Sequence, residues 1–242
     1  MRQYLVSFIK KFRGFLKYNF RRDNPKLPYI ITALVAFVVV VGGLNLFVEL
    51  TETIKEEILA TYDQQISEFI ISYRNPILTK YFIFMTNVGD VYGYLGVFSV
   101  VVLISVLLYK SWKYILQIIL VLMLASISNT ILKHFINRAR PGIEHLVEVE
   151  TLSYPSGHAM AAMAFYGFLI YLFHRFKINS ILKYSIMLLL VFIILSIGVS
   201  RIYLGVHYPS DIAGGYIAGL TWVFFCILIF NLVEVFRKDP KV

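Results

Sequence analysis

The feature that most constrains this chain is a series of apolar runs, each long enough to cross a lipid bilayer. About 20 consecutive apolar residues span the hydrocarbon core, and such runs recur along the sequence. Hydrophobic residues make up 59% of the chain and charged residues 15%, whereas soluble domains average about 25% charged residues. These proportions argue against a soluble enzyme, a disordered chain and a fibrous protein.

The apolar runs predict an all-α fold, a polytopic membrane bundle of six transmembrane helices. Only helices or closed barrels satisfy backbone polar groups within lipid, and the alternating pattern of barrel strands is absent. The apolar stretch 77–88 is too short to span, so we expect it to lie at the interface or to pack on the bundle. The six spans are expected at about 28–48, 91–109, 114–134, 158–174, 184–200 and 212–233.

The distribution of Lys and Arg predicts the orientation of these helices. Cytoplasmic segments of membrane proteins carry an excess of basic residues. If the N-terminus lies inside, the inner segments hold 16 of the 23 Lys and Arg but only three of the 14 Asp and Glu. This split predicts an N-in/C-in topology. The net charge of +9 therefore reflects topology, and no nucleic-acid partner is expected.

Three regions follow from the charge and hydropathy patterns. Residues 1–27 form a basic cytoplasmic N-terminal arm, which is either a topology anchor or a contact for anionic lipid. Residues 28–75 form the first transmembrane helix and an acidic outer loop. Residues 76–242 form a core that carries all the candidate chemistry, in segments 133–141, 155–158 and 200–211.

These three segments gather the polar residues that remain on the outer side. Lys133, Arg140 and Arg201 place three cations in a low-dielectric bundle, where unpaired charges are costly, so they imply a bound anion. Arg can bind phosphate oxygens bidentately, and Lys adds a point charge. Ser156 and Gly157 precede a helix, whose N–H groups and dipole can bind the same anion.

Two histidines in these segments can exchange protons near neutral pH, His158 and His207. Asp211 lies four residues after His207, one turn on if that stretch is helical, and there its carboxylate could fix the tautomer of the imidazole and strengthen it as a nucleophile. An anion pocket of three cations with two histidines and an orienting carboxylate indicates phosphoryl transfer.

The three segments resemble a known signature. Lys-x6-Arg-Pro at 133–141, Pro-Ser-Gly-His at 155–158 and Ser-Arg-x5-His-x3-Asp at 200–211 are similar to the three motifs of the type 2 phosphatidic acid phosphatase superfamily. The similarity covers about residues 80–233. The family includes membrane lipid phosphate phosphatases, glucose-6-phosphatase and vanadium haloperoxidases. A haloperoxidase is disfavoured, because known ones are soluble.

The resemblance implies a role for each signature residue. His207 attacks phosphorus and forms a phosphohistidine, Asp211 orients His207, and His158 protonates the leaving oxygen. No metal or other cofactor is implied, and the sequence has no carboxylate cluster suited to Mg²⁺. The phosphoryl oxygens are held by Lys133, Arg140, Ser156, Gly157 and Arg201.

The expected function is hydrolysis of a lipid phosphate at the outer face of a cell membrane, with the bilayer supplying the substrate. Candidate substrates by resemblance are undecaprenyl diphosphate, phosphatidylglycerol phosphate and phosphatidic acid, of which we favour the first. The oligomeric state is left open. The alternatives are a lipid phosphotransferase of the same family and a non-catalytic anion or lipid-binding membrane protein. An anion transporter would show inverted repeats and broken helices, and the sequence suggests neither.

Several neighbouring residues have two readings. Arg138 either touches the substrate or is exposed, and Asn129 either supports Lys133 or bonds between helices. The loop 142–153, with its acidic residues, either frames the entrance or is merely solvated. Two glycines of the last span, Gly215 and Gly219, predict close packing within the bundle.

Overall fold

The computed structural model describes residues 7, 10, 27–107, 112–149 and 152–237. The predicted basic arm falls almost entirely outside this part of the chain. The chain divides into two compact units, residues 41–223 and residues 1–40 with 224–242. The larger unit holds all three predicted motif segments. In the smaller unit, Ala33 and Ala36 are buried on one helix and Cys226 and Ile227 on another.

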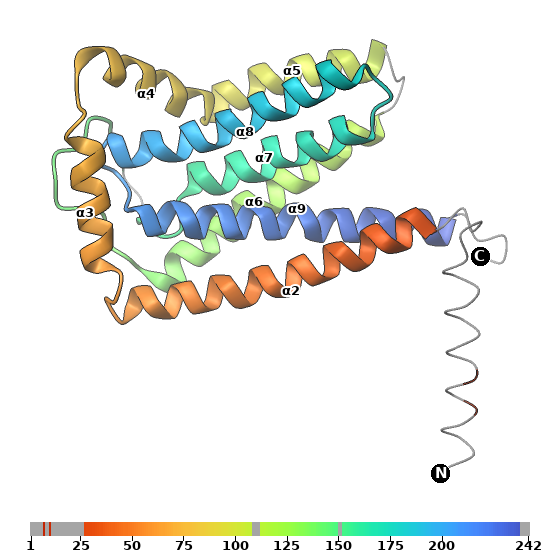
Figure 1. Cartoon of the computed structure of the whole chain (residues 1–242), viewed down its shortest axis with the longest axis horizontal. Coiled ribbons are helices and arrows are strands. Elements are labelled where there is room, and N and C mark those ends of the chain that lie inside the picture. Colours follow the sequence, from red (N-terminus) through yellow and green to blue (C-terminus); the bar gives the residue numbers. More distant parts are fainter. Residues whose placement is uncertain (1–6, 8–9, 11–26, 108–111, 150–151, 238–242) are drawn as a thin grey trace. The chain divides into compact units, whose positions relative to one another are not determined.

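All regular structure in the described residues is helical, and the described chain is a multi-pass membrane protein by the length and composition of its helices. Five helices are long and apolar enough to cross a membrane, and up to six spans result if a bent pair counts as one. The expected six spans agree with the upper figure. The helices, coloured along the chain in Figure 1, are α2 (Leu27–Lys55), α3 (Ala60–Ile71), α4 (Pro76–Val88), α5 (Val91–Leu107), α6 (Lys113–Ile136), α7 (Gly157–Arg175), α8 (Ser180–Tyr203) and α9 (Pro209–Arg237).

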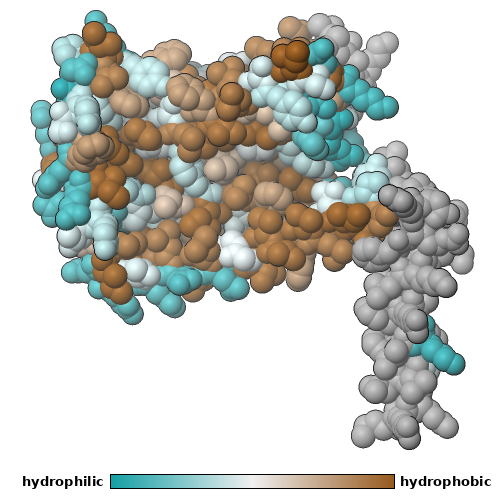
Figure 2. All heavy atoms as spheres, viewed as in Figure 1, coloured by the Kyte–Doolittle hydropathy of each residue, from teal (hydrophilic) through white to brown (hydrophobic). Residues whose placement is uncertain are grey.

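The helices expose apolar flanks, as expected where lipid is the solvent. Leu188 on α8, Leu103 on α5 and Leu116 on α6 are among the exposed large hydrophobic side chains. Figure 2 shows such side chains along the flanks of the helices, with hydrophilic ones gathered at the end that carries α3. A soluble protein rarely exposes so much continuous apolar surface, because that surface drives association in water.

Helix α7 is the most buried span, and small residues make its close packing possible. It packs against both α6 and α8, and Ala159, Ala162 and Ala164 on it are fully buried. A Cβ at Gly215 of α9 would lie 2.7 Å from the Ser156 carbonyl oxygen, so only glycine allows this approach. The predicted packing role of Gly215 within the bundle is confirmed.

The prediction of an acidic loop over 49–75 was wrong in its structure. Helix α2 continues through Lys55, and most of the remainder forms α3, which packs against α8. Two of the polar side chains of α3, Asp63 and Ser67, are buried. The charge of this segment had suggested solvation, whereas part of it is turned inward.

The short apolar stretch 77–88 and the next expected span, which starts at 91, correspond to helices α4 and α5. Helices α4 and α5 meet at a bend of 61°, with a break at residues 89–90, and together they qualify as a single broken span. Asn75 caps α4, because its side-chain oxygen accepts hydrogen bonds from the Ile77 and Leu78 amides, both at 3.0 Å. Helix α4 packs on α8, so of the two readings of 77–88, packing on the bundle holds.

Candidate active site

The three motif segments meet at one end of the helices of the 41–223 unit (Figure 1). Helix α6 carries Lys133 in its last turn, and Asn137 then takes a left-handed conformation (φ 53°) that ends the helix. Helices α7 and α9 begin at this end, at Gly157 and Pro209, and α8 finishes here. Helix ends far apart in sequence thus supply one polar site.

A polar pocket of about 210 Å³ lies between these helix ends. Two predicted residues, Ser156 and Asp211, do not line it but are fully buried beside residues that do. Three residues that the sequence had not singled out, Thr86, Asn87 and Asp90, add polar groups from the end of α4 and the break that follows it. The predicted residues that line the pocket are Lys133, Arg140, Gly157, His158, Arg201 and His207.

The three predicted cations are positioned by hydrogen bonds to fixed oxygens. Lys133 Nζ donates to the Leu152 carbonyl at 2.8 Å, and Arg140 Nη1 donates to the Val206 carbonyl at 2.6 Å. Arg201 Nη1 donates to Thr86 Oγ1 at 2.5 Å, but its buried Nε has no hydrogen-bond partner among the described residues. A buried donor without a partner is unusual and calls for a ligand oxygen.

The N-terminus of α7 supplies a further positive pole. Ser156 is the N-cap, and its hydroxyl accepts a hydrogen bond from the Ala159 amide at 3.5 Å. Gly157, the first helical residue, lines the pocket, where the helix dipole favours an anion. Asn129 Nδ2 donates to the Pro155 carbonyl at 3.1 Å, a bond from α6 to the turn before α7 that holds this turn in place. Direct phosphate contact by the Ser156 hydroxyl stays a prediction.

His207 and Asp211 form the expected pair across one turn. His207 Nδ1 lies 3.3 Å from Asp211 Oδ2, and its Nε2 lies 3.4 Å from Arg140 Nη1. A guanidinium can only donate, so Nε2 beside it is the nitrogen that carries a lone pair. Nδ1 then carries the hydrogen and donates it to Asp211, which leaves Nε2 free to act as a nucleophile toward the pocket.

Burial keeps this imidazole neutral. Desolvation lowers the pKa of His207 to about 4, although Asp211 acts in the opposite direction. Since the pKa lies below the ordinary value of about 6.5, His207 is unprotonated at neutral pH and its lone pair is available. Burial also lowers the pKa of the Arg140 guanidinium, which still remains charged because an arginine is not deprotonated in proteins.

The sequence missed a second layer of residues that hold Asp211. The Ser153 hydroxyl donates to Asp211 Oδ2 at 2.5 Å, and Arg138 Nη1 donates to Asp211 Oδ1 at 2.7 Å. Arg138 is also paired with Asp63 of α3 at 2.8 Å. Of the two readings of Arg138, neither substrate contact nor simple exposure describes it. A possible signal was its position two residues before Arg140.

The other polar residues of this region fall mostly outside the site. His134 and His145 are exposed, and His145 Nε2 lies 3.0 Å from the Pro141 carbonyl oxygen. Glu148 lines the polar pocket, so part of the 142–153 loop frames the site, while Glu150 lies outside the described residues. Among the described residues, no group of three or more His, Cys, Asp or Glu could hold a metal ion.

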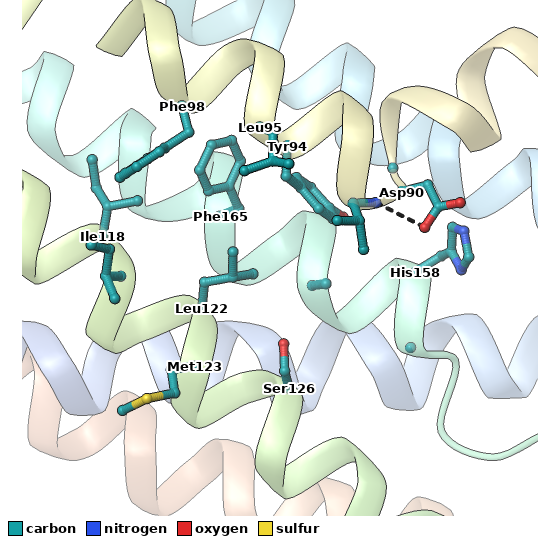
Figure 3. A pocket seen from close by; sticks show the side chains of 15 residues that line it. Asp90, Tyr94, Leu95, Phe98, Ile118, Leu122, Met123, Ser126, His158 and Phe165 are labelled. Carbon is teal, nitrogen blue, oxygen red and sulfur yellow. Dashed lines mark hydrogen bonds between the residues drawn. The ribbon is translucent and has the colours of Figure 1, made fainter. Parts of the chain in front are cut away.

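A second, apolar cavity of about 520 Å³ adjoins the polar pocket. Figure 3 shows Phe98, Leu122 and Phe165 pointing into it from α5, α6 and α7, with His158 at one end. Gly157, His158 and Asp90 line both cavities, so the two spaces meet at these residues. The polar pocket therefore opens toward a space lined mainly by hydrocarbon.

Comparison with known proteins places the chain among membrane phosphatases. Residues 114–234 match the family model of the PAP2 superfamily. The chain is 31% identical over 197 residues to phosphatidylglycerophosphatase B of Bacillus subtilis (strain 168), an alignment that covers 81% of this chain and 93% of that protein. A shorter stretch of 86 residues is 38% identical to the bacitracin transport permease protein BcrC of Bacillus licheniformis, covering 35% of this chain and 37% of that one.

Two solved structures share the fold. The crystal structure of a transmembrane PAP2-type phosphatidylglycerolphosphate phosphatase from Bacillus subtilis matches with a TM-score of 0.72 at 26% identity, over 83% of this chain and 98% of that chain. LpxE from Aquifex aeolicus matches with a TM-score of 0.54 at 23% identity, over 70% and 94% of the two chains, a likeness in fold alone.

Proposed function

The chain belongs to the PAP2 superfamily and is a membrane phosphatase, and on that premise we propose that it hydrolyses a lipid phosphate through a phosphohistidine on His207. The observation that carries the proposal is the polar pocket itself. Three cations and the N-terminus of α7 surround a space of about 210 Å³ onto which a neutral, carboxylate-paired imidazole faces. Such a site is complementary to phosphate and supplies a nucleophile beside it.

In the proposed reaction the cations bind first and then stabilise the transfer. Lys133, Arg140 and Arg201 hold the nonbridging oxygens, on which charge is spread in the transition state. The unpartnered Nε of Arg201 is a donor with no other oxygen to serve among the described residues. Because these groups are fixed before the substrate arrives, little reorganisation is needed as charge develops.

The covalent step uses the two histidines in turn. The lone pair of His207 Nε2 forms a bond to phosphorus as the bond from phosphorus to the lipid oxygen breaks. His158 donates a proton to the leaving oxygen, and it then takes a proton from the water that attacks the phosphohistidine. The products are the dephosphorylated lipid and phosphate, and His207 returns to its neutral form.

The apolar cavity supports a lipid as the substrate. It meets the polar pocket at His158, the proposed proton donor to the leaving oxygen, so the leaving group points toward it. Its volume of about 520 Å³ lies within the usual range of small-molecule pockets, about 300–1,000 Å³. One hydrocarbon chain of the substrate would occupy it.

The substrate we propose is phosphatidylglycerol phosphate. The Bacillus subtilis relative carries this activity in its name at 31% identity over most of both chains, and the Bacillus subtilis crystal structure that shares the fold is named for the same activity. The preference for undecaprenyl diphosphate stays a prediction, as no named relative supports it. Since all three candidate lipids present a phosphate to the three cations, selection among them must depend on the apolar cavity and on the parts of the head group beyond that phosphate.

We place the site on the outer face of the cell membrane, with both termini inside, because of the distribution of basic residues along the sequence. A Leu146→Cys variant tests this orientation, since Leu146 lies in the loop at the site end. In intact cells a membrane-impermeant thiol reagent is expected to label it. Labelling only after permeabilisation would invert the topology.

The test of the function is phosphate release from a panel of lipids by purified protein in detergent with EDTA. Phosphatidylglycerol phosphate is expected to have the highest kcat/KM among it, undecaprenyl diphosphate and phosphatidic acid. His207→Ala should lower kcat by about 10⁴-fold or more, whereas His134→Ala, an exposed histidine at the same end, should leave it unchanged. Full activity of His207→Ala, or no release from any lipid, contradicts the proposal. Lipid acceptors added to the assay reveal a phosphotransferase by their phosphorylated products.

A further inference from the structure

Arg138 forms ion pairs with two carboxylates, those of Asp63 and Asp211. Its Nη1 donates to Asp211 Oδ1 and to the Ser210 hydroxyl, both at 2.7 Å, and its Nη2 donates to Asp63 Oδ2 at 2.8 Å. The guanidinium carbon lies 4.5 Å from the centre of the Tyr208 ring. Its side chain is only 18% exposed, so the charge is partly shielded from water and depends on these partners.

Asp63 is as well fixed as the arginine. Its side chain is 3% exposed, and it accepts hydrogen bonds from the Ser210 amide at 2.9 Å and from the Ser210 hydroxyl. Ser210 lies in the first turn of α9, immediately before Asp211. The carboxylate thus ties α3 to the start of the helix that carries the partner of His207.

The two oxygens of Asp211 have different partners. Oδ1 accepts from Arg138 at 2.7 Å. Oδ2 accepts from the Ser153 hydroxyl at 2.5 Å and the Tyr208 amide at 2.8 Å, and lies 3.3 Å from His207 Nδ1. Arg138 therefore occupies the oxygen that does not face the histidine, and leaves the other to it.

A guanidinium with one carboxylate partner tends to bind both of its oxygens, because the two planar groups match bidentately. Without Asp63, Arg138 could take this geometry on Asp211 and compete with His207 for Oδ2. Asp63 binds the second terminal nitrogen of the guanidinium, Nη2, and so keeps it away from Asp211 Oδ2. We propose that Asp63 and Arg138 are positioning residues of the reaction, which orient Asp211 so that it directs the lone pair of His207 at the phosphate. This inference rests on the proposed role of His207 as the nucleophile.

Charge gives the two residues opposite effects on His207. Removing the positive charge of Arg138 strengthens the field of Asp211 at the imidazole and favours its protonated form. Removing the negative charge of Asp63 does the reverse. The elements that line the pocket around the imidazole contribute several charged or titratable groups, namely Asp211 on α9, Arg140 before the 142–149 loop, Glu148 within that loop, Arg201 on α8, His158 on α7, Lys133 on α6 and Asp90 between α4 and α5. These groups are common to all variants.

The experiment compares Asp63→Asn, Arg138→Lys and Arg138→Met with Glu68→Gln, an exposed carboxylate on the same helix. Asp63→Asn is expected to lower kcat by about 10- to 100-fold with KM little changed, because reacting groups are misplaced. Arg138→Met should raise the pKa of His207 far enough to add an enzyme ionisation to the acid limb of kcat/KM and move it to higher pH, whereas Asp63→Asn should leave the limb where the ionisation of the substrate sets it. Arg138→Lys should leave the acid limb of kcat/KM in place, because lysine retains the positive charge. It should still lower kcat, because lysine lacks the planar guanidinium that binds both carboxylates.

A wild-type kcat in Asp63→Asn, or an upward shift of the limb in both Asp63→Asn and Arg138→Met, overturns the inference. Thermal melting in detergent identifies any variant that does not fold. If Asp63→Asn is one of them, Arg138→Lys carries the test, and a wild-type kcat in that variant overturns the inference. His207→Ala, measured in parallel, separates a failure of the proposed function from a failure of the positioning role. Turnover retained there contradicts the proposed function, whereas an inactive His207→Ala beside a fully active Asp63→Asn contradicts only the positioning role.

Discussion

The polar pocket and the apolar cavity share a border but are built by opposite means. The polar pocket takes Lys133 and Arg140 from segment 133–141 and Arg201 from segment 200–211, and hydrogen bonds fix each of them. The cavity is lined mainly by hydrocarbon from α5, α6 and α7. One space recognises an anion by placed charges, and the other accepts a chain by shape alone. Changes in the first should therefore affect every phosphate substrate, and changes in the second only those with a long chain.

The largest effect is expected from Asp211→Asn. The asparagine amide can point its NH₂ group at His207 Nδ1 and so stabilise the wrong tautomer, in which Nε2 carries the hydrogen. On the order of a 10⁴-fold loss of kcat follows by analogy with other histidine–carboxylate pairs. The loss should be equal for a lipid and for a short water-soluble phosphate ester, in steady-state assays with Glu144→Gln as the control. A loss confined to the lipid would show that Asp211 does not act on every phosphate substrate.

Arg201→Ala comes next. It removes a buried cation whose Nε has no other partner among the described residues, and a lost transition-state donor costs about 10²- to 10³-fold in kcat. Arg201→Lys should recover part of the rate, because it restores the positive charge but not the planar guanidinium with its several donors. Arg175→Ala, an exposed arginine at the other end of α7, is the matched control. An unchanged kcat in Arg201→Ala would show that Arg201 does not stabilise the transferred phosphoryl group.

A smaller effect is expected from filling the cavity. Leu122→Trp places a larger side chain in the space shown in Figure 3 and should lower kcat/KM for a long-chain phosphate by about tenfold or more, since overpacking costs about 1–3 kcal/mol. A short soluble ester should be hydrolysed as by the wild type. Leu188→Trp, on an exposed flank of α8, controls for the added ring. Equal losses on both substrates would show that the cavity is not where the chain binds.

The smallest effect concerns pH. Because burial lowers the pKa of His207 to about 4, the imidazole stays unprotonated as the pH falls from 7 to 5, and it is protonated only below that range. The acid limb of kcat/KM should then follow the ionisation of the substrate alone, whose pKa can be read from a ³¹P NMR titration. A second ionisation of the enzyme near the ordinary histidine value of about 6.5 would contradict a buried, neutral His207.

How much the sequence could predict also differs between the two regions. In a chain with so few charges, Lys133, Arg140 and Arg201 stand out, and the spacing of His207 and Asp211 is one helical turn. No sequence feature singled out the partners of Arg138. Asp63 lies 75 residues away, and only the docking of α3 brings it near. The acidic surroundings of Asp63 made it resemble a solvated residue, although it is buried.

The apolar cavity was invisible in the sequence for a related reason. Leucines and phenylalanines that line a cavity look like those that fill a core or face lipid, and only packing tells them apart. The apolar runs on either side of Gly89 and Asp90 were separated in the sequence, but the bend that makes α4 and α5 one broken span was not predicted. Fold class and charge clusters were within reach of sequence patterns, whereas cavities, bends and long-range ion pairs depend on how the helices meet.

We propose that His207 carries the phosphoryl group during the reaction, and direct capture of the phosphohistidine tests this proposal. Lipid labelled with ³²P is mixed with enzyme, quenched within one turnover in alkali, and the digested protein is mapped. We expect an alkali-stable, acid-labile label on the peptide that contains His207, absent from His207→Ala and retained in His134→Ala. A label on another residue, or burst release of phosphate from His207→Ala at the wild-type rate, would contradict it.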